Sequence, residues 1–334
     1  MLSFGLLLSP FLWNTALFEF HAIAFALPLL FWLVVAYEKQ RYWLFLLIAT
    51  AVLLIREDMG LVIAGVGIVA ALEHRGIRWI VIPVAIGGAW FVAATQLSGY
   101  LSGYGGYKFL AYYGHLGDSL GGIVKNLALH PWIVLESLFG FRAILFMLGL
   151  FLPFFFLPFG RPKWLIPMLP PLFAFLLSRN NAEIILRIHY PIAMVPFLFL
   201  ALRDVLAAWN TGRGRIVQHL REYQQLAIIS IGIAFIYSFL VMSPIIGIAH
   251  DLPGKLSAER TRLLRAVAAE LPTTSGIAAG YSMLPNIATR SALVSLHYVF
   301  SGKQQFSERT YMPVPVDMIV MDPKDIIFYN ATND

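Results

Sequence analysis

Residues 22–55 read AIAFALPLLFWLVVAYEKQRYWLFLLIATAVLLI, two apolar runs joined by a connection that carries Lys39 and Arg41. Lipid cannot satisfy backbone N–H and C=O groups, so a chain crosses a bilayer either as helices or as a closed barrel. Both runs are continuous rather than alternating, which favours helices over barrel strands. This stretch therefore predicts two membrane-spanning helices that meet at a short basic loop.

The composition of the whole chain points to the same class of protein. Its 334 residues are 59% hydrophobic and 13% charged, with a mean hydropathy of +0.74. Soluble domains are about half apolar and about a quarter charged. The net charge of +6 comes from short basic clusters between apolar segments, so we expect membrane lipids as partners and no nucleic acid. With no cysteine, disulfides, thiolate metal sites and a cysteine nucleophile are excluded.

Apolar segments recur along the first three quarters of the chain and predict an all-α bundle of about nine spans. Several are shorter than the roughly 20 residues that cross a bilayer, so they extend into their flanks or pack inside the bundle. The segments cover residues 1–13, 22–36, 43–55, 59–72, 79–95, 137–159, 164–177, 190–208 and 225–243.

Basic residues are concentrated in alternate connections, which predicts the orientation of the bundle. Positive charge marks cytoplasmic loops, so these connections should lie inside an inner (plasma) membrane, with the N-terminus cytoplasmic and the C-terminal region extracytoplasmic. The first segment lacks such an anchor, and we expect further spans ahead of it in the complete protein. The inside residues are Lys39, Arg41, Arg75, Arg78, Arg161, Lys163, Arg203, Arg213, Arg215 and Arg221.

Two regions lie outside the predicted spans, and they define the domain organisation. The bundle, residues 1–243, contains an external loop at 96–135, in which Asp118 or Ser119 should cap an amphipathic interfacial helix that starts near Leu120. Residues 244–334 have the composition of a small soluble α/β domain. We expect a helix after Ser257 and strands at 277–281, 293–299 and 316–321.

Six ordered stretches resemble a family of predicted prokaryotic membrane proteins, domain of unknown function family 2079. The likeness extends over nearly the whole chain, and the order of the stretches is more specific than any one of them. They are FEFHAIAFALPLLFW (18–32), LLIREDMGLVIAGVG (53–67), YYGHLGDSLGGIVKN (112–126), LPFFFLPFGRPKWLIPMLPPLFAFLLS (152–178), IHYPIAMVPFLFLAL (188–202) and SMLPNIATR (282–290).

That family is distantly similar to the GT-C glycosyltransferases, multi-pass enzymes that use polyprenyl-phosphate sugars on the outer membrane face. The similarity implies a GT-C-like bundle, and it is an analogy of fold rather than of site. GT-C enzymes usually carry a catalytic carboxylate in their first external loop, and the family resemblance implies an acidic motif ahead of residue 1, so this chain looks truncated. Asn286 stands where the family tends to have His.

Glycosyl transfer needs a carboxylate to accept a proton and cations to hold the departing phosphate. Arg56, Glu57 and Asp58 form an external turn, in which one carboxylate is a candidate base and Arg56 a candidate phosphate ligand. A purely structural interpretation is that Asp58 caps the next helix while Arg56 pairs with Glu57. Glu19 and His21 lie at the outer end of the first two spans, where they are either functional or helix-end polar groups.

Further candidates come from the other outer connections. His189 follows Arg187, and together with His21, Glu57 and Asp58 it could bind Mg²⁺ or Mn²⁺, although no spacing signature requires a cofactor. Lys108 and Lys125 are candidate phosphate contacts in the external loop, whose tyrosines could equally form an interfacial belt.

We therefore hypothesise a GT-C-like enzyme with a polyprenyl-phosphate sugar donor and a lipid or glycan acceptor. Its catalytic candidates are Glu19, Glu57 and Asp58. The alternatives are a non-enzymatic transporter or assembly subunit, and an inactive truncated homologue. A transporter would need ionisable groups near the bilayer midplane, whereas the candidate charges gather at the outer rim.

Overall fold

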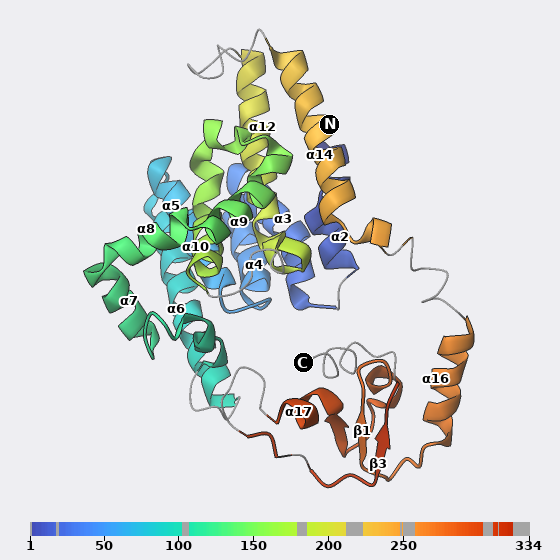
Figure 1. Cartoon of the computed structure of the whole chain (residues 1–334). Coiled ribbons are helices and arrows are strands. Elements are labelled where there is room, and N and C mark those ends of the chain that lie inside the picture. The colour runs from blue at the N-terminus through green and yellow to red at the C-terminus, as the bar shows by residue number, and fades with distance from the viewer. Residues whose placement is uncertain are drawn as a thin grey trace. The chain divides into compact units, whose positions relative to one another are not determined.

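The computed structural model describes residues 2–17, 20–101, 107–178, 186–211, 223–247, 249, 258–302, 310–312 and 314–322. The chain divides into two compact units, Met1–Ile246 and Gly247–Asp334. We call these the helical unit and the α/β unit. Figure 1 shows helices throughout the helical unit, whereas the three strands belong to the α/β unit.

The helical unit is a bundle of short helices with frequent breaks. Its α-helices are α1 (Leu2–Leu7), α2 (Pro10–Ala16), α3 (Ala26–Glu38), α4 (Tyr42–Leu53), α5 (Met59–Leu72), α6 (Ile77–Leu101), α7 (Leu120–Leu129), α8 (Pro131–Phe139), α9 (Phe141–Phe151), α10 (Leu169–Leu177), α12 (Val195–Thr211) and α14 (Gln224–Met242). In the described part of this unit, six 3₁₀ helices connect or extend them: η1 (Ala22–Phe25), η2 (Lys108–Tyr113), η3 (Leu152–Phe154), η4 (Leu157–Gly160), η5 (Pro162–Met168) and η6 (Tyr190–Ala193).

The lengths of these helices differ from the expected nine spans. Among the described residues, Ile77–Leu101 and Gln225–Met242 are long and apolar enough to cross a membrane. A third crossing is added if Pro131–Phe139 and Phe141–Phe154, bent by 59°, form one broken span. Five other apolar helices have only 10–17 residues. The structure therefore contains two or three clear spans within an apolar helical bundle.

Prolines explain part of this difference. Between Pro153 and Pro171 the prolines remove backbone donors and restrict φ, and the chain forms η3, η4 and η5 instead of one straight helix. Phe155 and Phe156 both have left-handed φ angles, 53° and 56°, where bulky side chains are rare. The predicted span at 137–159 is consequently divided into helical pieces.

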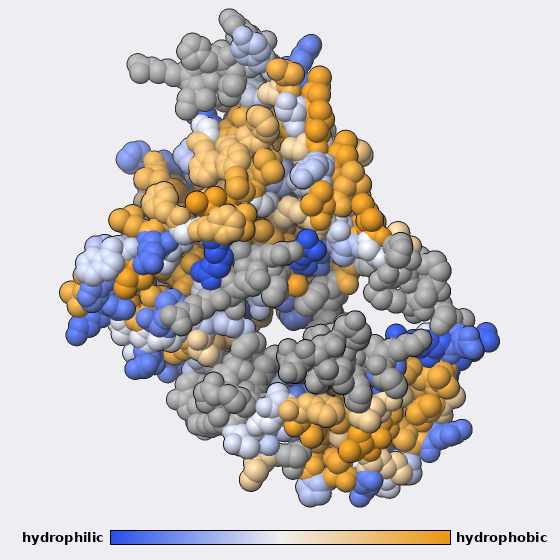
Figure 2. Space-filling model, viewed as in Figure 1, coloured by the Kyte–Doolittle hydropathy of each residue, from blue (hydrophilic) through white to orange (hydrophobic). Residues whose placement is uncertain are grey.

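Burial separates the helices into an inner and an outer set. The side chains from Val195 to Leu202 at the start of α12 are all buried, and α3 and α5 also contribute to the core. By contrast, only 17% of the α6 and α14 spanning windows is buried. Figure 2 shows hydrophobic side chains over much of the visible face of the helical unit. An apolar surface of this extent is expected where helices face lipid.

Helices α5 and α6 pack most closely at Gly60 and Gly87. A methyl group added to Gly87 would lie 2.2 Å from the Gly60 carbonyl oxygen, and one added to Gly60 would lie 2.3 Å from the Gly87 carbonyl oxygen. Small residues allow helix backbones to approach in this way, which compensates for the weak hydrophobic driving force in lipid. This crossing fixes α5, whose two ends carry the polar clusters described below.

The α/β unit contains a parallel sheet in the order β2-β1-β3, formed by Leu293–Ser295, Ile277–Ala279 and Met318–Val320. Helix α16 (Ala258–Glu270) packs on one face, with Leu264, Val267 and Ala268 against Ile277 and Ala279. The predicted helix and the cores of the three predicted strands are thus present. One detail was wrong: the strand predicted at 293–299 ends at Ser295, and Leu296–Ser301 form helix α17 instead.

Candidate functional site

The turn between α4 and α5 holds Arg56, Glu57 and Asp58. Arg56 donates from Nε and Nη2 to the two carboxylate oxygens of Asp58, at 2.5 and 2.6 Å. Asp58 occupies the position before α5 but caps no backbone N–H with its side chain. The structural interpretation from sequence was therefore wrong in both parts, because Arg56 pairs with Asp58 rather than Glu57 and Asp58 is not a capping side chain.

Glu57 has a different partner, far away in the sequence. The hydroxyl of Tyr107, just before η2, donates to Glu57 Oε1. Nearby, Tyr113 at the end of η2 donates to the Ala174 carbonyl oxygen of α10 at 2.9 Å. These two hydrogen bonds tie residues 107–113 to α10 and to the turn before α5, contacts that an interfacial belt alone would not require.

Two histidines from different connections stack beside this turn. The rings of His21 and His189 lie 3.9 Å apart with an interplanar angle of 18°. His189 is 5% exposed and contacts the ring of the next residue, Tyr190, at 4.5 Å. The guanidinium of Arg56 lies 5.7 Å from the Tyr190 ring centroid, a cation–π distance. The structure thus joins the connections that contain His21, Arg56 and His189.

We call this group the Arg56 cluster. It comprises His21, Arg56, Glu57, Asp58, Tyr107, His189 and Tyr190.

Burial and charge shift the protonation equilibria in this cluster. Burial, with smaller contributions from the nearby His21 and Arg56, lowers the pKa of His189 from 6.5 to about 4. His189 is consequently neutral near pH 7. Burial followed by the adjacent Glu57 carboxylate raises the pKa of Tyr107, so its hydroxyl stays protonated as a donor. Burial opposes the charge on Arg56, yet Asp58 and Glu57 outweigh that effect and raise its pKa.

A cavity of about 720 Å³ adjoins the cluster at Tyr107. One wall is the last part of α6, including Gln96 and Tyr100, and the other is the segment Asp118–Gly121 at the start of α7. Helix α7 begins where the sequence predicted, and Ser119 Oγ accepts a hydrogen bond from the Gly122 N–H at 3.1 Å. Tyr107 both lines the cavity and bonds Glu57, so it connects the two.

The remaining candidate residues are Lys125, Arg187, Glu19 and Lys108. Lys125 is exposed on α7, one turn beyond Gly121, and is not among the lining residues of the cavity. Arg187 is exposed two residues before His189. Glu19 and the side chain of Lys108 lie outside the described residues. Within the described part of the chain, no group of three or more His, Asp or Glu side chains could hold a metal ion.

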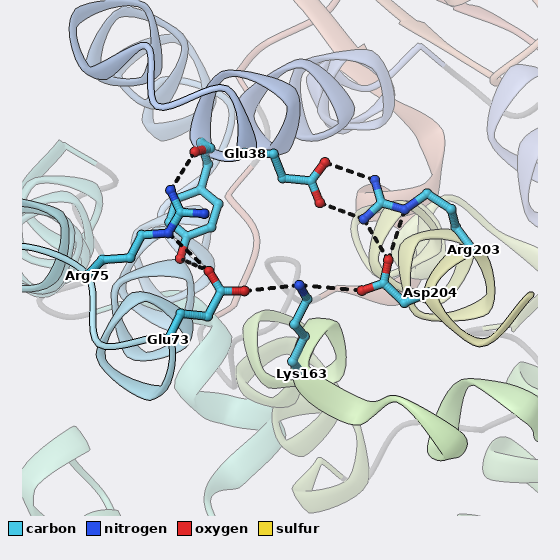
Figure 3. Close-up of polar contacts among 7 residues, drawn as sticks. Glu38, Glu73, Arg75, Lys163, Arg203 and Asp204 are labelled. Carbon is cyan, nitrogen blue, oxygen red and sulfur yellow. Dashed lines mark hydrogen bonds and ion pairs between the residues drawn. The ribbon is translucent and has the colours of Figure 1, made fainter. Parts of the chain in front are cut away.

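A second polar cluster lies at the other end of α5 (Figure 3). Glu73 accepts hydrogen bonds from Tyr37 at 2.8 Å, Arg75 at 3.0 Å and Lys163 at 3.0 Å. Lys163 also approaches Asp204 at 3.5 Å. Arg203 bonds Asp204 and both carboxylate oxygens of Glu38. We call Tyr37, Glu38, Glu73, Arg75, Lys163, Arg203 and Asp204 the Glu73 network.

Sequence analysis missed the Glu73 network as a unit. Arg75, Lys163 and Arg203 were read only as markers of the cytoplasmic side, and their acidic partners were not considered. A local signal exists, because an acid and a base lie within two residues of each other at Glu38 and Lys39, Glu73 and Arg75, and Arg203 and Asp204. The pairing among α3, the end of α5, η5 and α12 has no such signal.

Comparison with known proteins yields one result. The family model described as "Predicted membrane protein (DUF2079)" matches residues 1–332. No curated protein matches the chain. No solved structure matches it either.

Proposed function

The chain belongs to the DUF2079 family of predicted membrane proteins, and from this premise we propose that it is a glycosyltransferase that acts at the Arg56 cluster. Its donor is a polyprenyl-phosphate sugar and its acceptor a lipid or glycan hydroxyl. The observation that carries the proposal is the hydrogen bond from Tyr107 to Glu57, because Tyr107 also lines the 720 Å³ cavity. A substrate in that cavity would lie one side chain away from a carboxylate.

In the proposed reaction the acceptor oxygen attacks the anomeric carbon of the donor sugar. The bond between that carbon and the phosphate oxygen breaks, and the polyprenyl phosphate leaves with the electron pair. Glu57 accepts the proton of the acceptor hydroxyl, a role that contributes about 10²–10⁴-fold in rate when a base is well placed. Tyr107, which remains protonated, orients the Glu57 carboxylate.

Arg56 is the cation best placed for the departing phosphate. Its pair with Asp58 uses Nε and Nη2, so Nη1 is not part of that pair. Charge-assisted hydrogen bonds from guanidinium to phosphate are strong and directional. Asp58 positions Arg56, while Lys108, Lys125, Arg187, His21 and His189 are secondary candidates and Glu19 an alternative base. Any Mg²⁺ or Mn²⁺ would be held largely by substrate phosphate oxygens, as is common for Mg²⁺.

The basic connections support a placement in the inner membrane with a cytoplasmic N-terminus, about nine crossings before residue 244, and an extracytoplasmic α/β unit. The short apolar helices pack inside the bundle in this arrangement. The Arg56 cluster then faces the outside, where GT-C enzymes meet their lipid donors.

A transfer assay tests the proposal. Membranes containing the full chain are supplied with radiolabelled polyprenyl-phosphate sugars, and released polyprenyl phosphate and labelled product are both quantified. We expect Glu57→Gln to reduce transfer by about 10²–10⁴-fold and Asp58→Asn to weaken donor use through Arg56. Glu136→Gln is the control, since Glu136 is an exposed carboxylate of α8 outside the cluster.

Two outcomes would contradict the proposal. Equal transfer by wild type, Glu57→Gln and Asp58→Asn would remove these carboxylates from the mechanism. Absence of transfer by wild type from every lipid-phosphate sugar would contradict an enzymatic role and favour a transporter or assembly subunit.

A further inference from the structure

The cavity between α6 and α7 has a lining whose chemistry differs from that of the Arg56 cluster. Gln96 contributes a carboxamide, Asp118 a carboxylate, and Ser119 and Tyr100 contribute hydroxyls. None of the lining residues that the structure describes is Lys, Arg or His. We propose that this cavity binds an uncharged sugar ring, not a phosphate.

Charge is the first argument for this assignment. The carboxylate of Asp118 repels a phosphate but accepts hydrogen bonds from sugar hydroxyls. The Gln96 carboxamide can donate and accept at neighbouring hydroxyls. The phosphate of a lipid-linked sugar would then lie nearer Arg56, on the Glu57 side of Tyr107.

The aromatic lining is the second argument. Tyr100 lines the cavity and is 84% exposed, so the face of its ring is accessible to a ligand. The C–H faces of a sugar ring pack on the negatively polarised face of an aromatic side chain. Tyr107 provides a further ring on the side of the cavity that adjoins Glu57.

Size is consistent with a sugar. The volume of about 720 Å³ falls within the roughly 300–1,000 Å³ of small-molecule sites. The bound ring belongs either to the donor or to the acceptor, because both carry the same hydroxyl chemistry. The inference rests on the proposed function for its role in transfer, but binding of a sugar ring is measurable without any transfer.

Saturation-transfer-difference NMR provides that measurement. The full chain is placed in nanodiscs of phosphatidylglycerol and phosphatidylcholine, which carry no sugar headgroups, and methyl hexosides and methyl pentosides are the probes. We expect saturation transfer to at least one glycoside and none to methyl phosphate, whose methyl protons report binding of a phosphate group. Because hydrogen bonds to charged groups contribute about 1.5–3 kcal/mol, Asp118→Ala should weaken binding by about tenfold or more.

Matched variants identify the location. Gln96→Ala and Tyr100→Ala should also weaken binding, while Tyr223→Ala, which removes another largely exposed tyrosine, should not.

Adding a polyprenyl-phosphate sugar shows whether the bound ring belongs to the donor or to the acceptor. Displacement of the glycoside assigns the cavity to the donor sugar, and unchanged or stronger glycoside binding assigns it to the acceptor.

Three results would overturn the inference: no saturation of any glycoside, equal binding by wild type and the three cavity variants, or methyl phosphate binding that Lys108→Ala abolishes. None of these readouts depends on turnover. If glycosides bind but no sugar is transferred, the binding inference stands and the proposed enzyme function fails. If the cavity variants bind glycosides as wild type does and also transfer sugar normally, the enzyme function stands and the inference fails.

Discussion

The Arg56 cluster and the Glu73 network lie at opposite ends of α5, separated by 14 helical residues or about 21 Å. Both join connections that are distant in the sequence, and both contain arginine and carboxylates. Glu73 has three donors at ordinary hydrogen-bond distances, and Lys163 links it to Asp204 and so toward Arg203 and Glu38. The network ties the C-terminal ends of α3 and α5 to the middle of α12 and to η5, which carries Lys163.

The Arg56 cluster differs in composition and surroundings. It contains two stacked histidines, whereas the Glu73 network as defined contains no histidine. Its Glu57 carboxylate accepts a hydrogen bond from Tyr107, and Tyr107 also lines a cavity. We infer that the charged side chains at the two ends of α5 have different roles. We propose that the mutually paired Glu73 network holds helices together, whereas the Arg56 cluster beside the cavity retains groups for a ligand. Variants in and around α5 should distinguish the two roles.

The largest effect should follow from Gly87→Ala, which displaces the helix that carries both clusters. The added methyl group would lie 2.2 Å from the Gly60 carbonyl oxygen, so α5 and α6 must separate. Overpacking costs about 1–3 kcal/mol and sometimes more, and a backbone clash belongs at the upper end. We expect a lower melting temperature in detergent and impaired transfer. Gly88→Ala is the control because its methyl group meets nothing within 4 Å; equal stability of the two variants would contradict the close crossing.

Glu73→Gln should reveal a structural role for the Glu73 network. The substitution removes the charge that Tyr37, Arg75 and Lys163 share, and the side chain is only 26% exposed. Hydrogen bonds to charged groups contribute about 1.5–3 kcal/mol, so we expect a loss of about 2–3 kcal/mol in a sodium dodecyl sulfate unfolding titration.

Glu57→Gln is the matched comparison for Glu73→Gln. It should lose less than about 1 kcal/mol of stability, because it keeps a hydrogen-bond acceptor for Tyr107. A larger loss of stability in Glu57→Gln than in Glu73→Gln would contradict a mainly structural role for the Glu73 network.

The Arg56 cluster and the Glu73 network should also differ in the pH range in which acid destabilises them. The lowered pKa of His189, about 4 instead of 6.5, means that the folded protein binds fewer protons than the unfolded chain between these values. Stability therefore falls as pH decreases through that range, by about 2 kcal/mol at pH 4.5. Interactions with Lys163 and Tyr37 outweigh burial and lower the pKa of Glu73 from 4.5, so its contribution disappears only at lower pH.

His189→Phe preserves a ring beside His21 and removes the titration of residue 189. Melting temperatures recorded from pH 7 to pH 4 should decline less steeply in this variant than in wild type. Parallel declines would show that acid destabilisation in this range originates elsewhere.

The smallest effect should be confined to α7. Ser119→Ala removes the hydrogen bond to the Gly122 N–H and should cost about 1 kcal/mol of local stability. Hydrogen exchange should accelerate in the first turn of α7 and stay unchanged at both ends of α5. Ser119→Asp should restore protection because aspartate is an equally good cap. Unchanged exchange in Ser119→Ala would show that the cap does not stabilise this wall of the cavity.

Several local features were predictable because neighbouring residues determine them. The helix at 120–129 combines a serine cap with apolar spacing, and the cores of the three short strands follow from β-branched and apolar runs. The same reasoning failed at residues 296–301, where helix α17 follows directly from β2. Short apolar runs suit either element, and tertiary packing decides between them.

The candidate site was predictable only as a set of residue types. His21, Arg56, Glu57, Asp58 and His189 were selected because polar side chains are rare near apolar segments. Their partners were not predictable: Arg56 binds Asp58 instead of Glu57, and Glu57 binds Tyr107, fifty residues away. The cavity has no sequence signal, because residues from α6, η2 and α7 form it together.

By itself, the sequence determined that this is a membrane protein built from apolar helices, since no soluble fold could bury so much apolar surface. It also determined where several helices begin, through residues such as Ser119 that act on their immediate neighbours. Tertiary structure alone decided which charges meet. Ion pairs, ring stacking and cavities depend on distances of a few ångströms between segments far apart in the chain, and no local pattern encodes those distances.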